Sequence, residues 1–463
     1  MKKIGSQTIQ FINTPTIIET SSIVGPKESQ GPLATYFDKC LEDEFWGEET
    51  WEKAESKIIK ENVNSVILKS GIAATDIDFC FAGDLLNQCI SSSFGLRELN
   101  MPFFGVFGAC STFVESMCLG SVFIASGAAS NVLCATSSHF CSAEKQFRFP
   151  LELGNQRPPT AQWTVTGSGA AILSTNGTGP KITYITPGKI VDMGIKDANN
   201  MGAAMAPAAL DTLITHFRDT GRKPSYYDLI ITGDLGYIGK EILAELAETK
   251  GYNINANYND CGVLIFDKQK QDTHSGGSGC ACIGTVFSGY FFKQLKEKKV
   301  NRILLIATGA LMNSMSSQQG ETIPGIAHCK FMERKIFMID FLQNFDWMQL
   351  LRCFVVGGII CIIGQILIDK TKLTPARILV LFVTVGAILG GLGFYQHLIN
   401  FAGAGATTGF GANLAKGAIE EVQKIGLLGA FTGGVKASAG GIAAAIFFGY
   451  IASLIAKPKI KKQ

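Results

Sequence analysis

Residues 103–127 read FFGVFGACSTFVESMCLGSVFIASG, and this stretch decides the fold. The apolar run Phe103–Gly108 predicts a buried β-strand, and Thr112–Ser126 predicts a helix that ends at Gly127. The turn between them carries Cys110. A cysteine in this position lies beside the free N–H groups of a helix N-terminus. The turn therefore predicts that Cys110 lines a pocket.

Short β-rich runs alternate with helical segments to about Arg334, which predicts a layered α/β fold. The expected elements are strands at Asn131–Thr136, Leu229–Thr232, Gly262–Phe266 and Ile303–Ala307, and a helix at Gly239–Lys250. GACS at Gly108–Ser111 and GSGCAC at Gly277–Cys282 each lead through a helix to a strand. A duplicated half is the simplest interpretation, and chance similarity of two such units remains the alternative.

Charge and hydropathy divide the chain of 463 residues into two parts. Residues 350–463 have a net charge of +8, and since the whole chain has +3, the residues before them have −5. Three apolar runs of the tail approach the length that crosses a bilayer, at about 350–368, 378–394 and 437–456. We therefore expect a soluble domain over 1–334, a linker or interfacial segment over 335–349, and an all-α transmembrane domain over 350–463.

Several function classes are not expected from this sequence. The basic residues flank apolar runs, which indicates a lipid bilayer as partner and not nucleic acid. No G-x-x-x-x-G-K-[ST] motif occurs, so ATP hydrolysis is not expected. The 13 cysteines are scattered without metal-ligand spacing, which fits a reducing compartment and predicts no metal site.

The membrane face that carries the soluble domain stays open. The basic loops of the tail should both be cytoplasmic, and three spans then place the soluble domain on the opposite side. The many free cysteines and an N-terminus without an apolar signal region indicate the cytoplasmic side instead.

Particular segments resemble two sporulation protein families. The soluble part resembles the stage V sporulation protein AD family, which has a thiolase-like fold, and the tail resembles the small membrane protein AE of the same operon. The segments that carry the resemblance are QTIQFINTPTIIETSSIVGPKESQGPL (7–33), PPTAQWTVTGSGA (158–170) and TGDLGYIGKEIL (232–243) in the soluble part, and GGIICIIGQILIDKTKLTPARIL (357–379) and FFGYIASLIAKPK (447–459) in the tail.

The resemblance implies a function in spores. Members of these two families take up dipicolinic acid with calcium during sporulation and release it in germination. They act at the spore inner membrane together with other membrane subunits. It implies no cofactor, although calcium could accompany the ligand, and thiolase folds suggest a homodimer by analogy. The alternative is a membrane-attached thiolase-type acyltransferase acting on acyl-CoA.

The turn at Cys110 resembles the nucleophile turn of thiolases and ketoacyl synthases, in which the helix N-terminus lowers the thiol pKa. Those enzymes need a His to activate the Cys. The strand that carries this His in ketoacyl synthases is represented here by Leu229–Asp234, which contains none. The counterpart of their Asn-bearing loop is expected at Asn257–Gly262. We therefore expect Cys110 to be a pseudo-nucleophile and the chain not to be an enzyme.

The same turn could bind a carboxylate, because a helix N-terminus offers N–H donors and a positive dipole end. Arginines that bind carboxylates through two hydrogen bonds, amides and an aromatic wall at Trp163 would complete a site for a flat dianion. Asp84 is a candidate ligand for calcium. For every residue except Cys110, a structural role remains the alternative. The predicted ligand-binding residues are Cys110, Ser111, His139, Arg148, Arg157, Gln162, Asp84 and Gln88.

Overall fold

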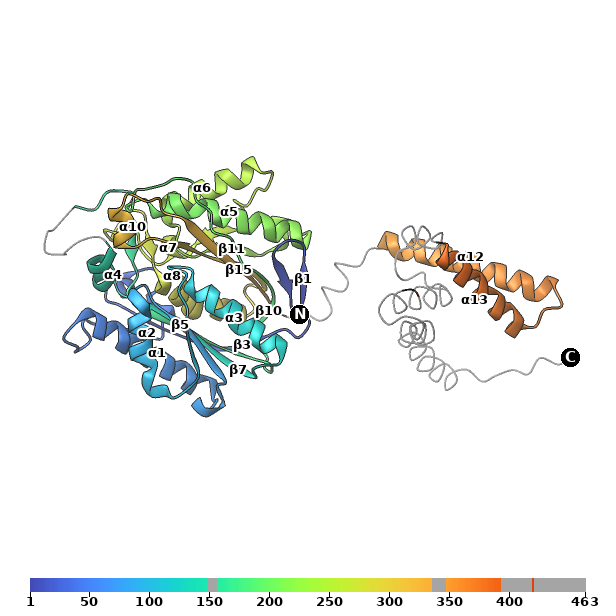
Figure 1. Ribbon diagram of the computed structural model, residues 1–463, viewed down its shortest axis with the longest axis horizontal. Helices are drawn as coiled ribbons and strands as arrows, with labels where there is room; N and C mark the ends of the chain where they lie inside the picture. Colours follow the sequence, from blue (N-terminus) through green and yellow to red (C-terminus); the bar gives the residue numbers. More distant parts are fainter. Residues whose placement is uncertain (148–155, 335–346, 393–418, 420–463) are drawn as a thin grey trace. The chain divides into compact units, whose positions relative to one another are not determined.

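The computed structural model describes residues 1–147, 156–334, 347–392 and 419. The chain divides into two compact units, Met1–Lys335 and Ile336–Gln463. In the first unit, the described residues form a 13-stranded mixed sheet that is covered by helices (Figure 1).

The large sheet consists of two halves with the same topology. Each half has two parallel pairs at its outer edge and two antiparallel pairs towards the centre, and the halves meet where Lys181 pairs with Thr16. This confirms the duplication that the sequence indicated. The first half runs in the order β6 (Phe103–Gly105), β5 (Phe79–Gly83), β7 (Asn131–Ser138), β9 (Gly167–Ser174), β3 (Thr16–Val24). The second runs β12 (Tyr258–Asp260), β11 (Leu229–Thr232), β14 (Arg302–Ala310), β15 (Gly325–Glu333), β10 (Lys181–Thr186).

Helices lie on both outer faces and between the two halves (Figure 1). The first half is covered by α1 (Trp51–Ser70) and α2 (Ile90–Leu96), and the second by α5 (Met201–Thr220) and α6 (Gly236–Thr249). The middle layer contains α3 (Thr112–Ser126) and the continuous run α8 (Cys280–Val286), η8 (Phe287–Phe291) and α9 (Phe292–Lys296). This is the duplicated, layered, thiolase-like α/β fold that was expected.

Small residues allow the middle layer to pack closely on the sheet. A Cβ atom added to Gly169 of β9 would lie 2.2 Å from the backbone of Gly284 in α8, so a larger residue cannot fit without movement. Fully buried phenylalanines such as Phe113 and Phe287 fill the remaining space between the halves.

Several short elements complete the first unit. The pair β8 (Trp163–Thr164) and β13 (Gly277–Ser278) connects the two halves beside the middle layer. The others are β1 (Lys2–Ile4), β2 (Thr8–Gln10), β4 (Lys39–Cys40), α4 (Phe140–Phe147), α7 (Cys261–Leu264) and α10 (Ser314–Gln318).

Two predicted strands are wrong in part or in full. Phe103–Gly108 was expected to be a buried strand, but β6 is a short edge strand with exposed side chains, because nothing described pairs with its outer side. Gly262–Phe266 was expected to be a strand, but the chain forms the helical turn α7, in which the Asp260 carboxylate caps the Gly262 N–H. Short apolar runs do not distinguish a strand from a helix, and here the cap by Asp260 favours the helical turn.

The second unit contains α12 (Trp347–Lys370) and α13 (Pro375–Gly391). The predicted span 350–368 lies within α12, most of 378–394 lies in α13, and 437–456 lies outside the described residues. Many apolar side chains on these helices are exposed, including Ile362 at 60% and Leu379 at 66%. By length and apolar composition, one helix of the described part could cross a membrane, Ala109–Ser126, but 72% of it is buried in the first unit, as in a core helix.

Candidate functional site

Cys110 lies on a strained turn at the start of α3. Ala109 has φ +51°, a left-handed conformation that is uncommon for a residue with a Cβ atom. The turn is held by short hydrogen bonds of 2.6 Å from the Ser111 hydroxyl to the Gly108 carbonyl and from the Thr112 hydroxyl to the Ala109 carbonyl. Ser111, a predicted ligand residue, therefore uses its hydroxyl to shape the turn.

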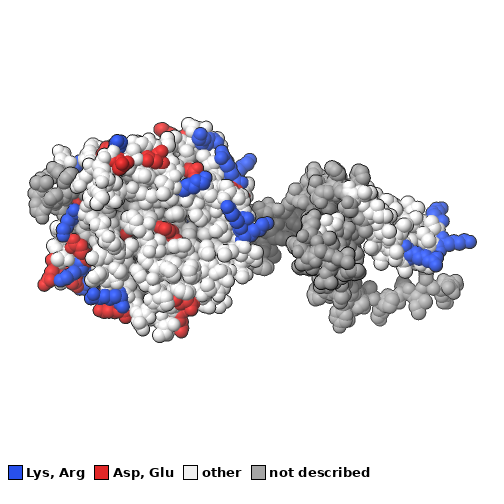
Figure 2. Space-filling model, in the orientation of Figure 1, with Lys and Arg blue, Asp and Glu red and all other residues white. Residues whose placement is uncertain are grey.

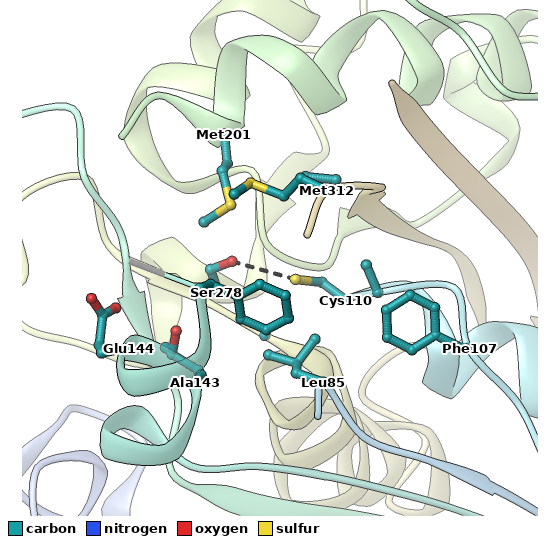
Figure 3. A pocket seen from close by; sticks show the side chains of 13 residues that line it. Leu85, Phe107, Cys110, Ala143, Glu144, Met201, Ser278 and Met312 are labelled. Atoms are coloured by element: carbon teal, nitrogen blue, oxygen red, sulfur yellow. Dashed lines mark hydrogen bonds between the residues drawn. The ribbon is translucent and has the colours of Figure 1, made fainter. Parts of the chain in front are cut away.

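The thiol faces a small, mostly apolar pocket (Figure 3). The space open to the centre of a water-sized molecule is about 40 Å³, enough for a few waters. The pocket is lined by Leu85, Phe107, Ala109, Cys110, Ala143, Glu144, Phe147, Thr164, Met201, Ser278, Gly279, Ala310 and Met312.

A wider vestibule of about 320 Å³ adjoins this pocket. The two share Leu85, Phe107, Phe147 and Met312, which stand between the inner and the outer space. Gln88, a predicted ligand residue, is exposed in the vestibule lining. A ligand would therefore approach Cys110 through the vestibule.

A hydroxyl lies beside the thiol. Cys110 Sγ lies 3.6 Å from Ser278 Oγ (Figure 3). Burial, and then the nearby Asp234 carboxyl, raise the pKa of the Cys110 thiol well above its ordinary value. This differs from the lowered thiol pKa of the nucleophile turns that the segment resembles, because burial and a neighbouring acid act against the helix N-terminus.

Asp234 follows β11, at the end of the segment where the sequence lacks the expected His. Its Oδ1 accepts a 2.6 Å hydrogen bond from the Thr308 hydroxyl, whereas Oδ2 has no hydrogen-bond partner in the described part of the chain. Burial raises the pKa of Asp234 to about 7. A buried acid with a raised pKa thus lies near Cys110, and it is a poor base for a thiol whose own pKa is raised well above its ordinary value.

Gln162 lies behind the pocket and joins two elements. Its Nε2 donates to the carbonyl oxygens of Asp234 at 2.5 Å and Gly277 at 3.2 Å. Its Oε1 is buried, and no described residue donates a hydrogen bond to it. Gln162 was predicted as a ligand residue, but it does not line the pocket and its donors hold the backbone that positions Ser278.

His139 is buried and its ring is occupied by structural contacts. Its Nε2 lies 2.8 Å from the Glu44 carbonyl oxygen, and its Nδ1 accepts a hydrogen bond from the Cys141 N–H at 3.2 Å. Burial lowers the pKa of His139. His139 is not among the pocket residues. The Asn257 amide likewise serves the backbone, because it donates to the Tyr227 carbonyl at 2.6 Å and not towards Cys110.

Asp84 is fully buried and its carboxylate is occupied by nearby donors. Oδ1 accepts from the Leu86 N–H at 2.8 Å, and Oδ2 accepts from the Ser92 hydroxyl at 2.6 Å. Burial raises the pKa of Asp84. No group of three or more His, Cys, Asp or Glu residues in the described ranges is placed to hold a metal ion. Asp84 therefore shapes the loop beside the pocket.

Arg157 stands in a separate cationic and aromatic stack. Its guanidinium lies 4.9 Å from the Trp163 ring, and Lys27 Nζ lies 3.5 Å from the centre of the same ring. Phe140 stacks on Trp163 at 3.6 Å. This stack is outside the pocket lining. Arg148 lies outside the described residues, so its placement is not known from the structure.

Sequence reasoning missed Ser278, Glu144, Met201 and Met312 as pocket residues. The repeat contained the signal for Ser278: two turns with Gly and Cys, GACS at 108–111 and GSGC at 277–280, open the two central helices α3 and α8, and these helices contact each other. The residues just before α8 must then lie near those just before α3. The two methionines and Glu144 come from segments without a recognisable motif.

Comparisons with known proteins match both units to sporulation families. Residues 5–333 match the family model "Stage V sporulation protein AD (SpoVAD)", and residues 349–455 match "SpoVAC/SpoVAEB sporulation membrane protein". The chain is 44% identical over 334 residues to stage V sporulation protein AD of Bacillus subtilis (strain 168), covering 72% of this chain and 98% of that protein. It is 32% identical over 117 residues to stage V sporulation protein AC of the same organism, covering 22% of this chain and 77% of that protein.

Two solved structures have distant similarity to this chain. One is 3-oxoacyl-[acyl-carrier-protein] synthase III from Aquifex aeolicus VF5, with 13% identity, a TM-score of 0.42, and coverage of 69% of this chain and 99% of that chain. Another is a Xanthomonas campestris OleA variant with bound lauric acid and lauroyl-CoA, with 12% identity, a TM-score of 0.45, and coverage of 69% and 98%.

Proposed function

Because the chain belongs to the stage V sporulation protein AD family, with a tail from the SpoVAC/SpoVAEB sporulation membrane-protein family, we propose that it binds calcium dipicolinate and helps to pass it across the spore inner membrane. Membership of these families gives a role in sporulation and an association with a membrane. The tail was expected to resemble protein AE; its family includes that type, and the curated relative it matches is protein AC.

The chemistry around the Cys110 thiol is the observation that carries the non-enzymatic part of this proposal. Acyl transfer needs a thiolate, and a thiolate needs a base or a positive charge beside it. The described pocket lining contains no His, Lys or Arg. Burial, and then Asp234, raise the pKa of the Cys110 thiol instead. A thiol in this setting fits a pocket wall and not a nucleophile.

The charge of the pocket favours a ligand without net charge. A free dipicolinate dianion would bring two negative charges close to Glu144, an acidic residue of the pocket lining, and burial of unpaired charge is costly. In the calcium chelate, the ion neutralises both carboxylates of the ligand. We therefore expect the chelate to bind more tightly than the free dianion, with the Ser278 and Thr164 hydroxyls as its polar contacts on the protein.

The ring of the ligand needs more room than the inner pocket offers. The inner space of about 40 Å³ opens through Met312 and Phe147 into the vestibule of about 320 Å³. Methionine side chains are unbranched and adapt to irregular shapes, so movement of Met201 and Met312 would join the two spaces. A flat aromatic ligand would then lie between Phe107 and the methionines.

The test is calorimetric titration of calcium dipicolinate into residues 1–334, with acetyl-CoA turnover measured on the same preparation. This unit has its own core and corresponds to a separate chain in the curated AD relative, 98% of which it covers. Cys110→Ala should weaken binding, and Cys40→Ala, which removes an exposed thiol, should not. Saturable binding without turnover supports the proposal, whereas turnover without binding would replace it with the acyltransferase alternative.

A homodimer through the edge strand β6 is part of the proposal. Phe103, Phe104 and Phe107 are exposed at this edge, and Phe107 also lines the pocket. An apolar edge strand pairs readily with another chain, so a second copy would cover the phenylalanines beside the site. Phe103→Lys should shift residues 1–334 from dimer to monomer in sedimentation analysis, and an unchanged mass would count against the dimer.

A further inference from the structure

Basic side chains gather at the end of the first unit from which the chain continues towards the tail. Figure 2 shows Lys and Arg side chains gathered along the right edge of this unit, whereas elsewhere on this face basic and acidic side chains are mixed. Arg334 holds this end together, because it donates to the carbonyls of Leu295 and Lys296, where α9 ends. We call the basic residues around it the exit patch: Lys181, Arg222, Lys296, Lys298, Lys299, Arg302 and Arg334.

The exit patch has a positive excess in a unit that is negative overall. Its acidic neighbours are Glu19, Glu297, Glu333 and Asp228. Glu19 pairs with Lys296 at 3.0 Å and Glu297 with Lys299 at 2.8 Å, both at the surface, where such pairs are weak. Asp219 also lies near Arg222, so seven basic against five acidic side chains leave a net charge of about +2 on this end.

The backbone at Lys298 has a conformation that favours glycine, although the residue is a lysine. Lys298 has φ +64°, the left-handed conformation that ends a helix and that glycine adopts at least cost. The helices α1, α3 and α5 each end in such a conformation at a glycine: Gly71, Gly127 and Gly221. The α9 end uses a lysine at this position, although a glycine there would be more stable.

The patch also contains an aromatic ring between two arginines. The guanidinium groups of Arg222 and Arg302 lie 4.2 Å and 4.4 Å from the Tyr226 ring. Tyrosine and basic side chains together are typical of the boundary between lipid and water.

We propose that the exit patch binds the anionic headgroups of a phospholipid bilayer. The chain leaves this end at Arg334, and the membrane-family tail begins at residue 349, so the intervening 14 residues can span at most about 50 Å. Anionic lipid surfaces attract basic segments held close to them. The proposal does not depend on which ligand the pocket binds.

This binding mode would orient the pocket away from the bilayer. The run from α8 to α9, Cys280–Lys296, begins beside Cys110 and ends at the exit patch, and its 17 residues are about 25 Å long. With the exit patch on the headgroups, the pocket would open on the aqueous side. Ligand would then be taken from solution before it reaches the membrane.

The test is sedimentation of residues 1–334 with vesicles of phosphatidylglycerol and phosphatidylcholine, and with vesicles of phosphatidylcholine alone. Binding should require the anionic lipid and should weaken steeply with salt. Lys298→Gly should bind about fivefold more weakly, because it removes one charge close to the surface. The substitution should not lower the thermal stability, since glycine adopts this backbone conformation at least cost. If Lys298 had only a structural role, the substitution would lower the thermal stability instead.

The control is Lys270→Gln, which removes an exposed lysine paired with Asp267 in a loop outside the patch. Equal binding of Lys298→Gly and Lys270→Gln, or sedimentation that does not depend on anionic lipid, would overturn the proposal. A second measurement uses the full chain in liposomes: an amine-reactive label should reach Lys298 less readily in anionic than in neutral lipid, and equal labelling would also overturn it.

Discussion

Lys330 is a fully buried lysine in the middle of the first unit, and its replacement by methionine should stabilise the protein. Its ammonium group lies 4.3 Å from the Phe287 ring and 5.5 Å from the Phe113 ring, and it contacts the sulfur of Met117. No carboxylate in the described ranges forms an ion pair with it. Burial lowers the pKa of Lys330 from 10.5 to about 7. Methionine has a similar length and leaves no charge to bury.

The size and sign of the effect follow from proton linkage. Between pH 7 and 10.5 the unfolded chain binds more protons at Lys330 than the folded chain, so stability rises with pH. At pH 7 the burial of this amine costs about 4 kcal/mol, and at pH 9 about 2 kcal/mol, from the shift in pKa. Lys330→Met should therefore raise the free energy of unfolding by amounts of this order, with the larger gain at the lower pH.

Urea unfolding of residues 1–334, for wild type and Lys330→Met at several pH values from 6 to 9, measures both quantities. In the folded state the thiols of Cys118 and Cys134 stay protonated from pH 6 to 9, because burial raises the pKa of both, so they do not add to the difference between the two proteins. Lys299→Met, at an exposed position, should change stability by less than about 0.5 kcal/mol. A gain that is equal at pH 6 and 9, or a loss of stability at pH 7, would refute the argument.

Three further predictions concern the pocket and the packing of the middle layer. Alkylation of the folded unit at pH 8 should modify exposed Cys40 and leave Cys110 unmodified, since burial and Asp234 keep the Cys110 thiol protonated. Mass spectrometry measures the labelling of each cysteine, and early labelling of Cys110 would contradict this prediction. The pKa of Asp234 is raised from 3.8 to about 7 in the folded unit. Its contribution to the stability of the unit is therefore fully present below pH 4 and is lost as the pH rises through 7. Asp234→Asn should remove this decline, of about 4 kcal/mol, from the denaturation profile, and an unchanged profile would contradict the shift. Gly169→Ala should destabilise the unit by several kcal/mol, because its Cβ would overlap Gly284. Gly47→Ala, at an open surface position with φ +76°, should cost only about 1 kcal/mol. Equal losses of stability in thermal melts would argue against the close packing.

The sequence predicted most of the fold because its signals were local and repeated. The helix Thr112–Ser126, its end at Gly127 and the strand Leu229–Thr232 are observed as predicted. The repeat of two turns that open helices indicated the duplication. The strand predicted at Gly262–Phe266 failed because a single cap by Asp260 selects a helical turn, and short apolar runs are equally compatible with either structure.

The candidate site was harder to predict, because its residues converge from segments that are distant in sequence. Cys110 was identified from its position between a strand and a helix. Arg157 and His139 carry suitable chemistry, but tertiary contacts direct them to Trp163 and to the Glu44 backbone. Nothing local in the sequence reveals such contacts, since a polar residue that can bind a ligand can equally satisfy a buried backbone group.

Backbone strain links the pocket to the argument for a binding function. Three of the seven non-glycine residues with positive φ in the described part of the chain are Gln88, Cys89 and Ala109, which line the vestibule or the pocket. Each such conformation costs of order 1 kcal/mol or more and persists only where the surroundings enforce it. Burial, and then Asp234, raise the pKa of the Cys110 thiol in this geometry. The strain maintains the shape of the pocket, and a fixed pocket shape is what the binding function proposed above requires.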